Sequence, residues 1–299
     1  MKVNINQLDT EKINLKTINI DNADALEIAR LFNDEDKQVA YAVEKQLDQI
    51  AQVIDIAAQT IQNDGRIVYI GAGNSGRLAA GDACECIPTF GVEENVVIYI
   101  LAGGPNALIK ADEKAEDSLE QGIEDLKQAN LTSKDLVIGL SASGRTPYTK
   151  AGLDYAKSIG CQTVSIACSH NAIISQNTDI CIEILVGQEA ITGSTRLKAG
   201  TAQKMVLNII SSGAMIKLGK VYKNYMVDVS VKNAKLFERG KKIIKEVTNV
   251  SDETAEFYLN ESHGKVKNAI VMINKSISYE ESVKLLKENA HIGKIIQSV

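Results

Sequence analysis

The fold of this chain is decided by the segment IVYIGAGNSG at residues 67–76, where a short apolar run meets a glycine-rich turn. Four more apolar or β-branched runs follow, at residues 96–101, 136–140, 163–167 and 180–185. Nearly all residues of the first four runs are apolar, as is typical of strands buried on both faces of a sheet, whereas Glu183 interrupts the fifth. Segments long enough for helices separate the first four runs. This alternation predicts an α/β fold, a parallel sheet with helices on both faces.

Apolar residues at spacings of three and four predict the helices around this sheet. One stripe begins near Asn33 and reaches Ile54, which predicts a single amphipathic helix. A second stripe, with Ala111 on its apolar side, predicts a helix over residues 106–126. Ser278 and Glu281 have the spacing of a capping box and predict the start of the last C-terminal helix. Besides the helix at 106–126, we expect helices at residues 148–158 and 198–217.

The chain of 299 residues divides into three predicted parts. We expect an N-terminal helical arm at residues 1–50, an α/β domain at 51–225 and a small helical module at 226–299, because the β signal fades from about Val229. No apolar run approaches the roughly 18 residues of a membrane span. Residues 1–15 contain no hydrophobic signal region.

Charge and cysteine usage narrow the class of protein further. The formal charge of −5 argues against a nucleic-acid binder, which usually carries a basic surface. Five cysteines, an odd number without paired spacing, do not predict a secreted disulfide framework. We therefore expect a cytoplasmic protein that binds neither nucleic acid nor a membrane.

The turn at residues 71–76 matches the pattern G-x-G-x-x-G of dinucleotide-binding folds. Such a site needs an acidic residue at the end of the second strand, about twenty residues on. That strand ends at Leu101, and Glu93 and Glu94 precede it, at the wrong edge of the sheet. The dinucleotide interpretation is therefore disfavoured. The turn either offers backbone N–H groups to an anion or contains its glycines for packing alone.

A second polar turn, SASGRTPY at residues 141–148, follows the third predicted strand. Ser141, Ser143 and Thr146 supply hydroxyl donors, and Arg145 supplies positive charge. Pro147 suits the first turn of a helix. Both turns lie at the carboxyl edge of the predicted sheet, where open parallel sheets bind ligands. Together they predict a small anionic ligand, and phosphate is the favoured candidate.

These motifs resemble the N-acetylmuramic acid 6-phosphate etherase family, within the SIS (sugar isomerase) superfamily of phosphosugar-binding domains. The pairing of GNSG at 73–76 with SGRT at 143–146 resembles the superfamily, and the stretches 70–91 and 191–229 resemble the etherases. The resemblance covers nearly the whole chain. Asn74 stands where the family usually has Thr, and Ile87 stands where it has the first of two prolines.

The resemblance implies a flavodoxin-like SIS fold and a specific reaction. The family cleaves the D-lactyl ether of N-acetylmuramic acid 6-phosphate with water, giving N-acetylglucosamine 6-phosphate and (R)-lactate, in the recycling of cell-wall amino sugars. It also implies a homodimer with sites near the subunit interface. Elimination followed by hydration needs two acid–base groups. We expect no cofactor and no metal, and Cys84 and Cys86 lack metal-ligand spacing.

The resemblance implies that Glu85 is the general acid and Glu116 the base. Glu85 is expected near the end of its helix, buried beside Cys84 and Cys86, where the neutral acid is favoured. Without the resemblance, the sequence favours an exposed Glu85 at the end of its helix, since Glu is rarely buried. Glu116 belongs to an acidic stripe that usually marks a solvated helix face, and only the family match singles it out. The stripe comprises Glu113, Glu116, Glu120 and Glu124.

Candidate phosphosugar ligands lie in three loops. The first two turns supply Ser75, Ser143, Gly144, Arg145 and Thr146. The loop before residue 198 supplies Thr192, Ser194 and Lys198, for which a plain loop and helix cap is an equal alternative. Two rival functions share the superfamily: a non-catalytic regulator like the glucokinase regulatory protein, and an aldose–ketose phosphosugar isomerase. Neither would release lactate.

Overall fold

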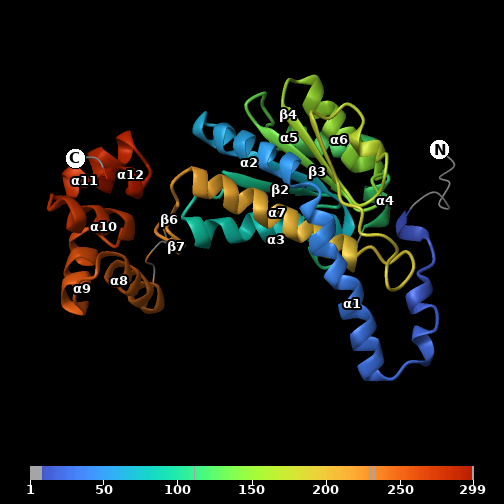
Figure 1. Cartoon of the computed structure of the whole chain (residues 1–299). Coiled ribbons are helices and arrows are strands. Elements are labelled where there is room, and N and C mark those ends of the chain that lie inside the picture. The colour runs from blue at the N-terminus through green and yellow to red at the C-terminus, as the bar shows by residue number, and fades with distance from the viewer. Residues whose placement is uncertain (1–8, 111, 229–230, 232, 298–299) are drawn as a thin grey trace. The chain divides into compact units, whose positions relative to one another are not determined.

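The computed structural model describes residues 9–110, 112–228, 231 and 233–297, and within them the chain forms a five-stranded parallel sheet (Figure 1). All five predicted strands are confirmed to within two residues at either end. The first and third are buried along their whole length, as continuous apolar runs require. The strands are β1 (Ile67–Gly71), β2 (Val97–Leu101), β3 (Leu136–Ser141), β4 (Gln162–Ala167) and β5 (Ile180–Glu183).

The strand order is β2-β1-β3-β4-β5, with every neighbouring pair parallel. The chain leaves β1 toward β2 on one side and later returns to β3 on the other side of β1. This is the flavodoxin-like order, and it confirms the predicted fold class. Its topological switch point lies at the carboxyl ends of β1 and β3, where such sheets bind ligands.

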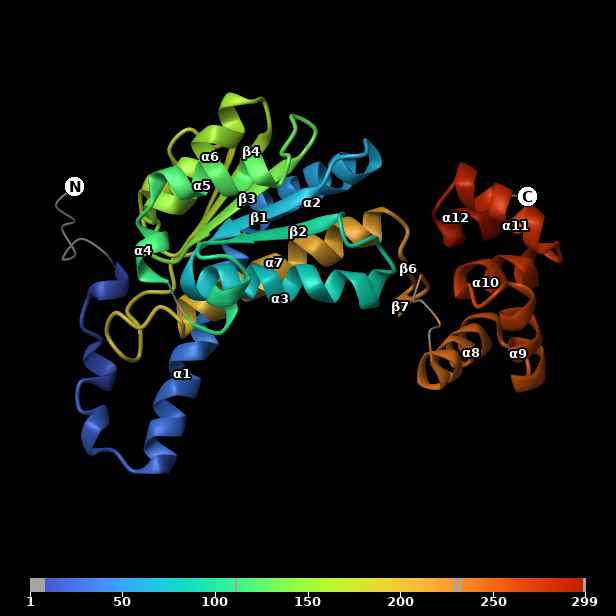
Figure 2. The same ribbon diagram turned by 180° about the vertical axis from the view of Figure 1, so that it is seen from behind.

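Helices cover both faces of the sheet, as predicted. One face carries α5 and α6, and the opposite face carries α2, α3 and α7 (Figures 1 and 2). The prediction for residues 198–217 is confirmed, and Pro147 begins α6 as expected. These helices are α2 (Leu47–Gln62), α3 (Gly73–Phe90), α5 (Leu119–Gln128), α6 (Pro147–Ser158) and α7 (Lys198–Lys217).

The prediction of one helix from Asn33 to Ile54 is wrong. The segment breaks after α1 (Ala25–Glu44). Gln46 precedes α2 with φ −112° and ψ 9°, and its side-chain oxygen accepts a hydrogen bond of 3.2 Å from the backbone N–H of Glu183. Helix α1 also starts earlier than expected, at the N-cap residue Asp24. The first turns of α1 are exposed, including the apolar residues Leu26 and Ile28, and the signal that marks this start is Asp24, whose side chain accepts a hydrogen bond from Glu27 N.

The prediction of one helix over residues 106–126 is also wrong. The segment forms the 3₁₀ turn η5 (Pro105–Leu108), the one-turn helix α4 (Glu113–Glu116) and α5, while Ala111 lies outside the described residues. Asp112 caps α4, and Ser118 caps α5 by accepting a hydrogen bond from Gln121 N. Such caps start new helices and end old ones. The acidic stripe is therefore divided between two helices.

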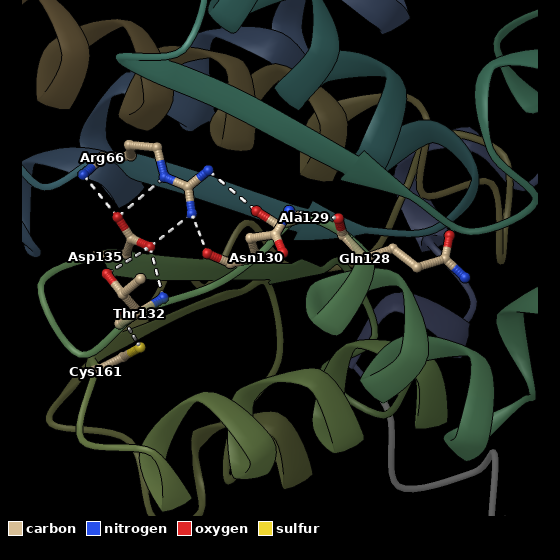
Figure 3. Close-up of polar contacts among 7 residues, drawn as sticks. All are labelled: Arg66, Gln128, Ala129, Asn130, Thr132, Asp135 and Cys161. Atoms are coloured by element: carbon tan, nitrogen blue, oxygen red, sulfur yellow. Dashed lines mark hydrogen bonds and ion pairs between the residues drawn. The ribbon is translucent and has the colours of Figure 1, made fainter.

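The edge of the sheet opposite the predicted site is held by Arg66 (Figure 3). Its guanidinium makes a bidentate contact with Asp135, at 3.1 and 2.8 Å, and donates to the backbone oxygens of Ala129 and Asn130 at the end of α5. Thr132 N donates to Asp135 over 2.9 Å. Burial alone would raise the pKa of Asp135, but the hydrogen bonds from Arg66 and Thr132 outweigh burial and lower it. This cluster connects the start of β1 to the start of β3 and the end of α5.

The described residues form two compact units. The first holds the residues up to Cys84 together with Asn95–Ser211, and the second holds Glu85–Glu94 together with the residues from Ser212 onward. The N-terminal arm thus packs with the α/β domain, and the predicted boundaries at residues 50 and 225 stay a prediction. Within the described ranges, no helix is long and apolar enough to cross a bilayer.

The second unit contains the hairpin of β6 (Val221–Tyr222) and β7 (Tyr225–Met226) and the C-terminal helices, which bury their own apolar core. The capping box of Ser278 and Glu281 is confirmed, but it begins α11 and a further helix follows, so the prediction that it opens the last helix is wrong. Residue 229, where the β signal was expected to fade, lies outside the described residues. The helices are α8 (Ala234–Thr248), α9 (Asp252–Glu261), α10 (Val266–Lys275), α11 (Tyr279–Glu288) and α12 (Ile292–Gln297).

Candidate functional site

The first predicted anion-binding turn joins β1 directly to α3. Gly73 begins the helix with φ +53°, a left-handed conformation that favours glycine, so the N–H groups of the first turn lie at the carboxyl end of β1. Gly76 serves packing, because a Cβ there would lie 2.4 Å from Leu101 Cδ1 and 2.7 Å from Gly71 O. The turn therefore combines both interpretations: Gly76 is explained by packing, and Gly73 opens a helix N-terminus.

The second turn, between β3 and α6, is ordered by its own hydroxyl groups. Ser141 Oγ lies 2.9 Å from Thr146 Oγ1. The backbone N–H of Arg145 points toward Ser141 Oγ at 3.2 Å and Ser143 Oγ at 3.3 Å. Gly144 has φ +71°, and a Cβ there would lie 2.5 Å from Ala172 Cβ. These contacts within the loop restrict its conformations, and such preorganisation lowers the entropic cost of binding a ligand.

Glu116, at the end of α4, contacts the second turn and lies near the first. Its Oε1 accepts a hydrogen bond of 3.3 Å from Thr146 Oγ1, and its Oε2 lies 3.7 Å from the position that a Cβ on Gly73 would take. Burial raises the pKa of the Glu116 carboxyl, the Thr146 hydrogen bond partly opposes the rise, and the charges of Asp117 and Glu113 add to it. A carboxyl group whose pKa is raised by burial is a candidate for acid–base chemistry.

Ser75 lies in the first turn of α3 and is bound to a residue that the sequence analysis missed. Its hydroxyl donates to Gln203 Oε1 on α7 over 2.9 Å, and both side chains are buried. No sequence signal singled out Gln203, because a lone amide inside a long helix has no periodic pattern. Asn74, the departure from the family pattern, packs its Nδ2 against α7, where a Cβ on Gly200 would lie 2.8 Å away.

The N-terminus of α7 is occupied by a buried carboxylate. Glu189 accepts hydrogen bonds of 2.9 Å from the backbone N–H groups of both Lys198 and Ala199. Its side chain is fully buried, and burial raises the pKa of this carboxyl. The preceding loop leaves Thr192 exposed and Ser194 half-buried. The start of α7 is therefore a loop and a helix cap, as in the alternative given for this loop, and Glu189 is the cap.

The side chain of Lys198 is buried in an ion pair. Its Nζ contacts the Glu35 carboxylate on α1, and both residues are less than 5% exposed. Asn14 Nδ2 donates to the same carboxylate over 2.9 Å, and Lys16 Nζ lies 3.4 Å from it. Burial would raise the pKa of Glu35, but Lys198, Asn14 and Lys16 outweigh burial and lower it. Lys198 thus attaches the N-terminal arm to α7, and its predicted contact with a phosphosugar stays a prediction.

Glu85 lies in the second compact unit, more than three turns along α3 from Gly73. Its side chain is exposed, and the helix continues through Pro88 to Phe90. The prediction that Glu85 is buried near the helix end is therefore wrong for the single chain. The cause is helical periodicity: the buried stripe of α3 contains Asp82, Ala83, Cys86 and Phe90, and the exposed stripe contains Gly81, Cys84, Glu85 and Pro88.

Comparisons with known proteins agree with this geometry. Residues 118–211 match the SIS domain family, residues 49–157 match the N-terminal SIS domain of the glucokinase regulatory protein, and residues 223–275 match the C-terminal lid domain of that protein. A phosphoheptose isomerase from Francisella tularensis has a TM-score of 0.50 at 12% identity, over 64% of this chain and 98% of that one. At this identity the likeness shows the fold alone. The chain is thus a protein with an SIS-type α/β domain.

Full-length relatives identify the family. The N-acetylmuramic acid 6-phosphate etherase of Clostridium beijerinckii is 50% identical over 298 residues, which cover 99% of this chain and 98% of the relative. The etherase of Bacillus subtilis is 48% identical over 296 residues, with 99% and 97% covered. The chain belongs to the N-acetylmuramic acid 6-phosphate etherase family.

Proposed function

We propose that this protein is an N-acetylmuramic acid 6-phosphate etherase, which cleaves the D-lactyl ether with water to give N-acetylglucosamine 6-phosphate and (R)-lactate. The observation that carries the proposal is the position of Glu116, which contacts the second polar turn and lies near the first, in a chain that aligns over nearly its full length with etherases. In the cell we place the reaction in the cytoplasm, in the recycling of cell-wall amino sugars. The five free thiols suit a reducing compartment.

The proposed chemistry begins at the ring-opened aldehyde of the substrate. The carbonyl acidifies the C2 proton, and Glu116 removes it as the base. The electron pair then forms the C2–C3 double bond while the C3–O bond breaks, and the lactyl oxygen takes a proton from a general acid. Water adds across the double bond, with its oxygen at C3 and a proton at C2. Each acid–base group contributes about 10²- to 10⁴-fold.

The phosphate is proposed to bind at the carboxyl ends of β1 and β3. Ser75 and Ser143 supply hydroxyl groups, Arg145 supplies positive charge, and Gly144 and Thr146 belong to the turn that encloses the anion. This placement is supported by the topological switch point and by the N-terminus of α3, which directly follows β1. A phosphate there would leave Glu116, on the side of Thr146, facing the sugar. Thr192 and Ser194, in the loop before α7, are proposed to contact the sugar.

Glu85 is proposed to be the general acid, in a homodimer whose second subunit helps to form the site. A carboxyl group donates a proton near neutral pH only where its surroundings stabilise the neutral form. Because Glu85 is exposed in the single chain, we propose that a second copy covers the exposed stripe of α3. The acid that serves one Glu116 would then come from the partner subunit.

Isotope labelling tests the proposed reaction. The protein is incubated with N-acetylmuramic acid 6-phosphate in H₂¹⁸O, and both products are analysed by mass spectrometry. Elimination and hydration place the label at C3 of the sugar and none in the lactate hydroxyl. Label in that hydroxyl would indicate cleavage on the other side of the ether. A regulator or an aldose–ketose isomerase would release no lactate at all.

A further inference from the structure

Gln203 has a hydrogen-bonding pattern that the phosphate site does not yet explain. Its side chain is fully buried, and its Oε1 accepts the hydroxyl hydrogen of Ser75. Its Nε2 has no hydrogen-bond partner among the described residues. A buried amide group without a partner is unfavourable, and few occur in folded proteins. A rotation of the Gln203 amide by half a turn would place Nε2 beside Ser75, a proposed phosphate ligand.

The orientation of the Gln203 amide determines whether the Ser75 hydroxyl can donate a hydrogen bond to a phosphate. A serine hydroxyl has one hydrogen to donate, and a phosphate dianion only accepts hydrogen bonds. While Ser75 donates to Gln203 Oε1, it has no hydrogen left for a phosphate. A half-turn of the amide exchanges its oxygen and nitrogen, so that Nε2 donates to Ser75 Oγ. The hydroxyl hydrogen of Ser75 is then free to point at the anion.

We propose that Gln203 is a positioning residue, which turns its amide when the substrate binds and thereby directs the Ser75 hydroxyl toward the phosphate. The inference rests on the proposed function, because it assumes that a phosphate monoester binds beside Ser75. Gln203 itself does not touch the substrate. The amide is suited to this role because it can both accept from Ser75 and donate to it. A side chain that only accepts, or does neither, fails to direct the hydroxyl.

The variant Gln203→Glu tests the role directly. A carboxylate of nearly the same shape only accepts, so it holds the Ser75 hydrogen for as long as it is ionised. We expect KM and the inhibition constant of inorganic phosphate to rise roughly 10- to 100-fold near pH 8, the effect of losing a hydrogen bond to a charged group. The kcat should change little. At lower pH the protonated carboxyl donates to Ser75, so the ratio of variant to wild-type KM should fall toward one.

Ser211→Ala is the matched control. Ser211 is also buried on α7 and donates to Asp82 on α3 over 3.1 Å, away from both phosphate turns. Its loss removes a comparable contact between the same two helices. We expect normal KM and normal phosphate inhibition for this variant. If Ser211→Ala raises KM as much as Gln203→Glu does, Gln203 acts only through helix packing and the proposal is wrong.

A double-mutant cycle separates this proposal from the proposed function. Gln203→Met keeps the length of the side chain but offers neither donor nor acceptor of comparable strength, and it serves even if Gln203→Glu does not fold. In the Ser75→Ala background, Gln203→Met should raise KM no further, because Gln203 acts through Ser75. Additive effects would overturn the positioning role. If Ser75→Ala alone leaves KM and phosphate inhibition unchanged, the proposed phosphate site itself is refuted.

Discussion

At the scale of single residues, Glu116 is the side chain on which burial, hydrogen bonding and nearby charge act together. We expect Glu116→Gln to lower kcat by about 10²- to 10⁴-fold, with little change in KM, because the amide cannot take a proton. Lactate release measures the effect. Glu124→Gln is the control, since it removes an exposed carboxylate of the same sequence stripe. Near-normal lactate release by Glu116→Gln would exclude Glu116 as the base.

The hydrogen bond from Thr146 to Glu116 predicts a shift in pH dependence. Burial raises the pKa of Glu116, and Thr146 opposes that rise by stabilising the ionised form. Thr146→Val should therefore raise this pKa further and move the acidic limb of the kcat/KM profile to higher pH, because a base must be ionised to act. Ser143→Ala is the control, since Ser143 shares the loop without a contact to Glu116. A limb that moves equally in both variants would contradict the prediction.

At the scale of secondary-structure elements, the Arg66–Asp135 pair holds together the starts of β1 and β3. Asp135→Asn should lower the free energy of unfolding by roughly 3 kcal/mol near pH 7, because Arg66 loses its buried partner. The folded-state pKa of Asp135 is lowered, so its contribution is present above about pH 4, the unfolded value. It is lost as the pH falls through the folded-state pKa.

Urea unfolding across this pH range measures the contribution of Asp135. The difference between wild type and Asp135→Asn should shrink as the solution is acidified. Asp34→Asn is the control, because Asp34 pairs with Lys37 on the exposed surface of α1. Surface pairs of this kind contribute little to stability. A pH-independent loss for Asp135→Asn would mean that packing, not the ion pair, sets its effect.

The buried pair of Glu35 and Lys198 allows a test of what Lys198 does. Glu35→Leu alone should destabilise the chain by about 3–5 kcal/mol, because it leaves a buried charge without a partner. Glu35→Leu combined with Lys198→Met should recover much of that stability. If Lys198 only attaches the arm to α7, the double variant keeps a normal KM. A raised KM in a stable double variant would instead support the predicted contact with the phosphosugar.

At the scale of the whole molecule, the proposed shared site predicts complementation. Glu85→Gln and Glu116→Gln should each be inactive as homodimers. When the two are unfolded and refolded together, random pairing makes half of the dimers mixed, and each mixed dimer has one intact site. We therefore expect about a quarter of wild-type activity. No recovery, in a mixture shown to contain mixed dimers, would mean that both carboxylates act within one chain.

The sequence predicted most of the α/β domain, because buried parallel strands have a strong local signal. The strands and α7 followed from apolar runs and periodicity. Two of the wrong helix predictions joined segments that the structure separates. At Gln46 the backbone leaves the helical conformation without a side-chain cap, whereas Asp112 caps the start of α4, and the stripe of apolar residues passes through both breaks without showing them. The break at Asp112 matters most, since it allows Glu116 to end a one-turn helix beside Thr146.

By itself, the sequence determined the class of fold, the two polar turns and the family. Each of these depends on residues close together in the chain, where spacing alone carries the information. Only the tertiary structure decided that Glu116 binds Thr146, that Lys198 pairs with Glu35 and that Gln203 binds Ser75. These contacts join residues 30, 163 and 128 positions apart. Because they exist only once the strands are ordered and the helices are packed, no local pattern in the sequence could specify them.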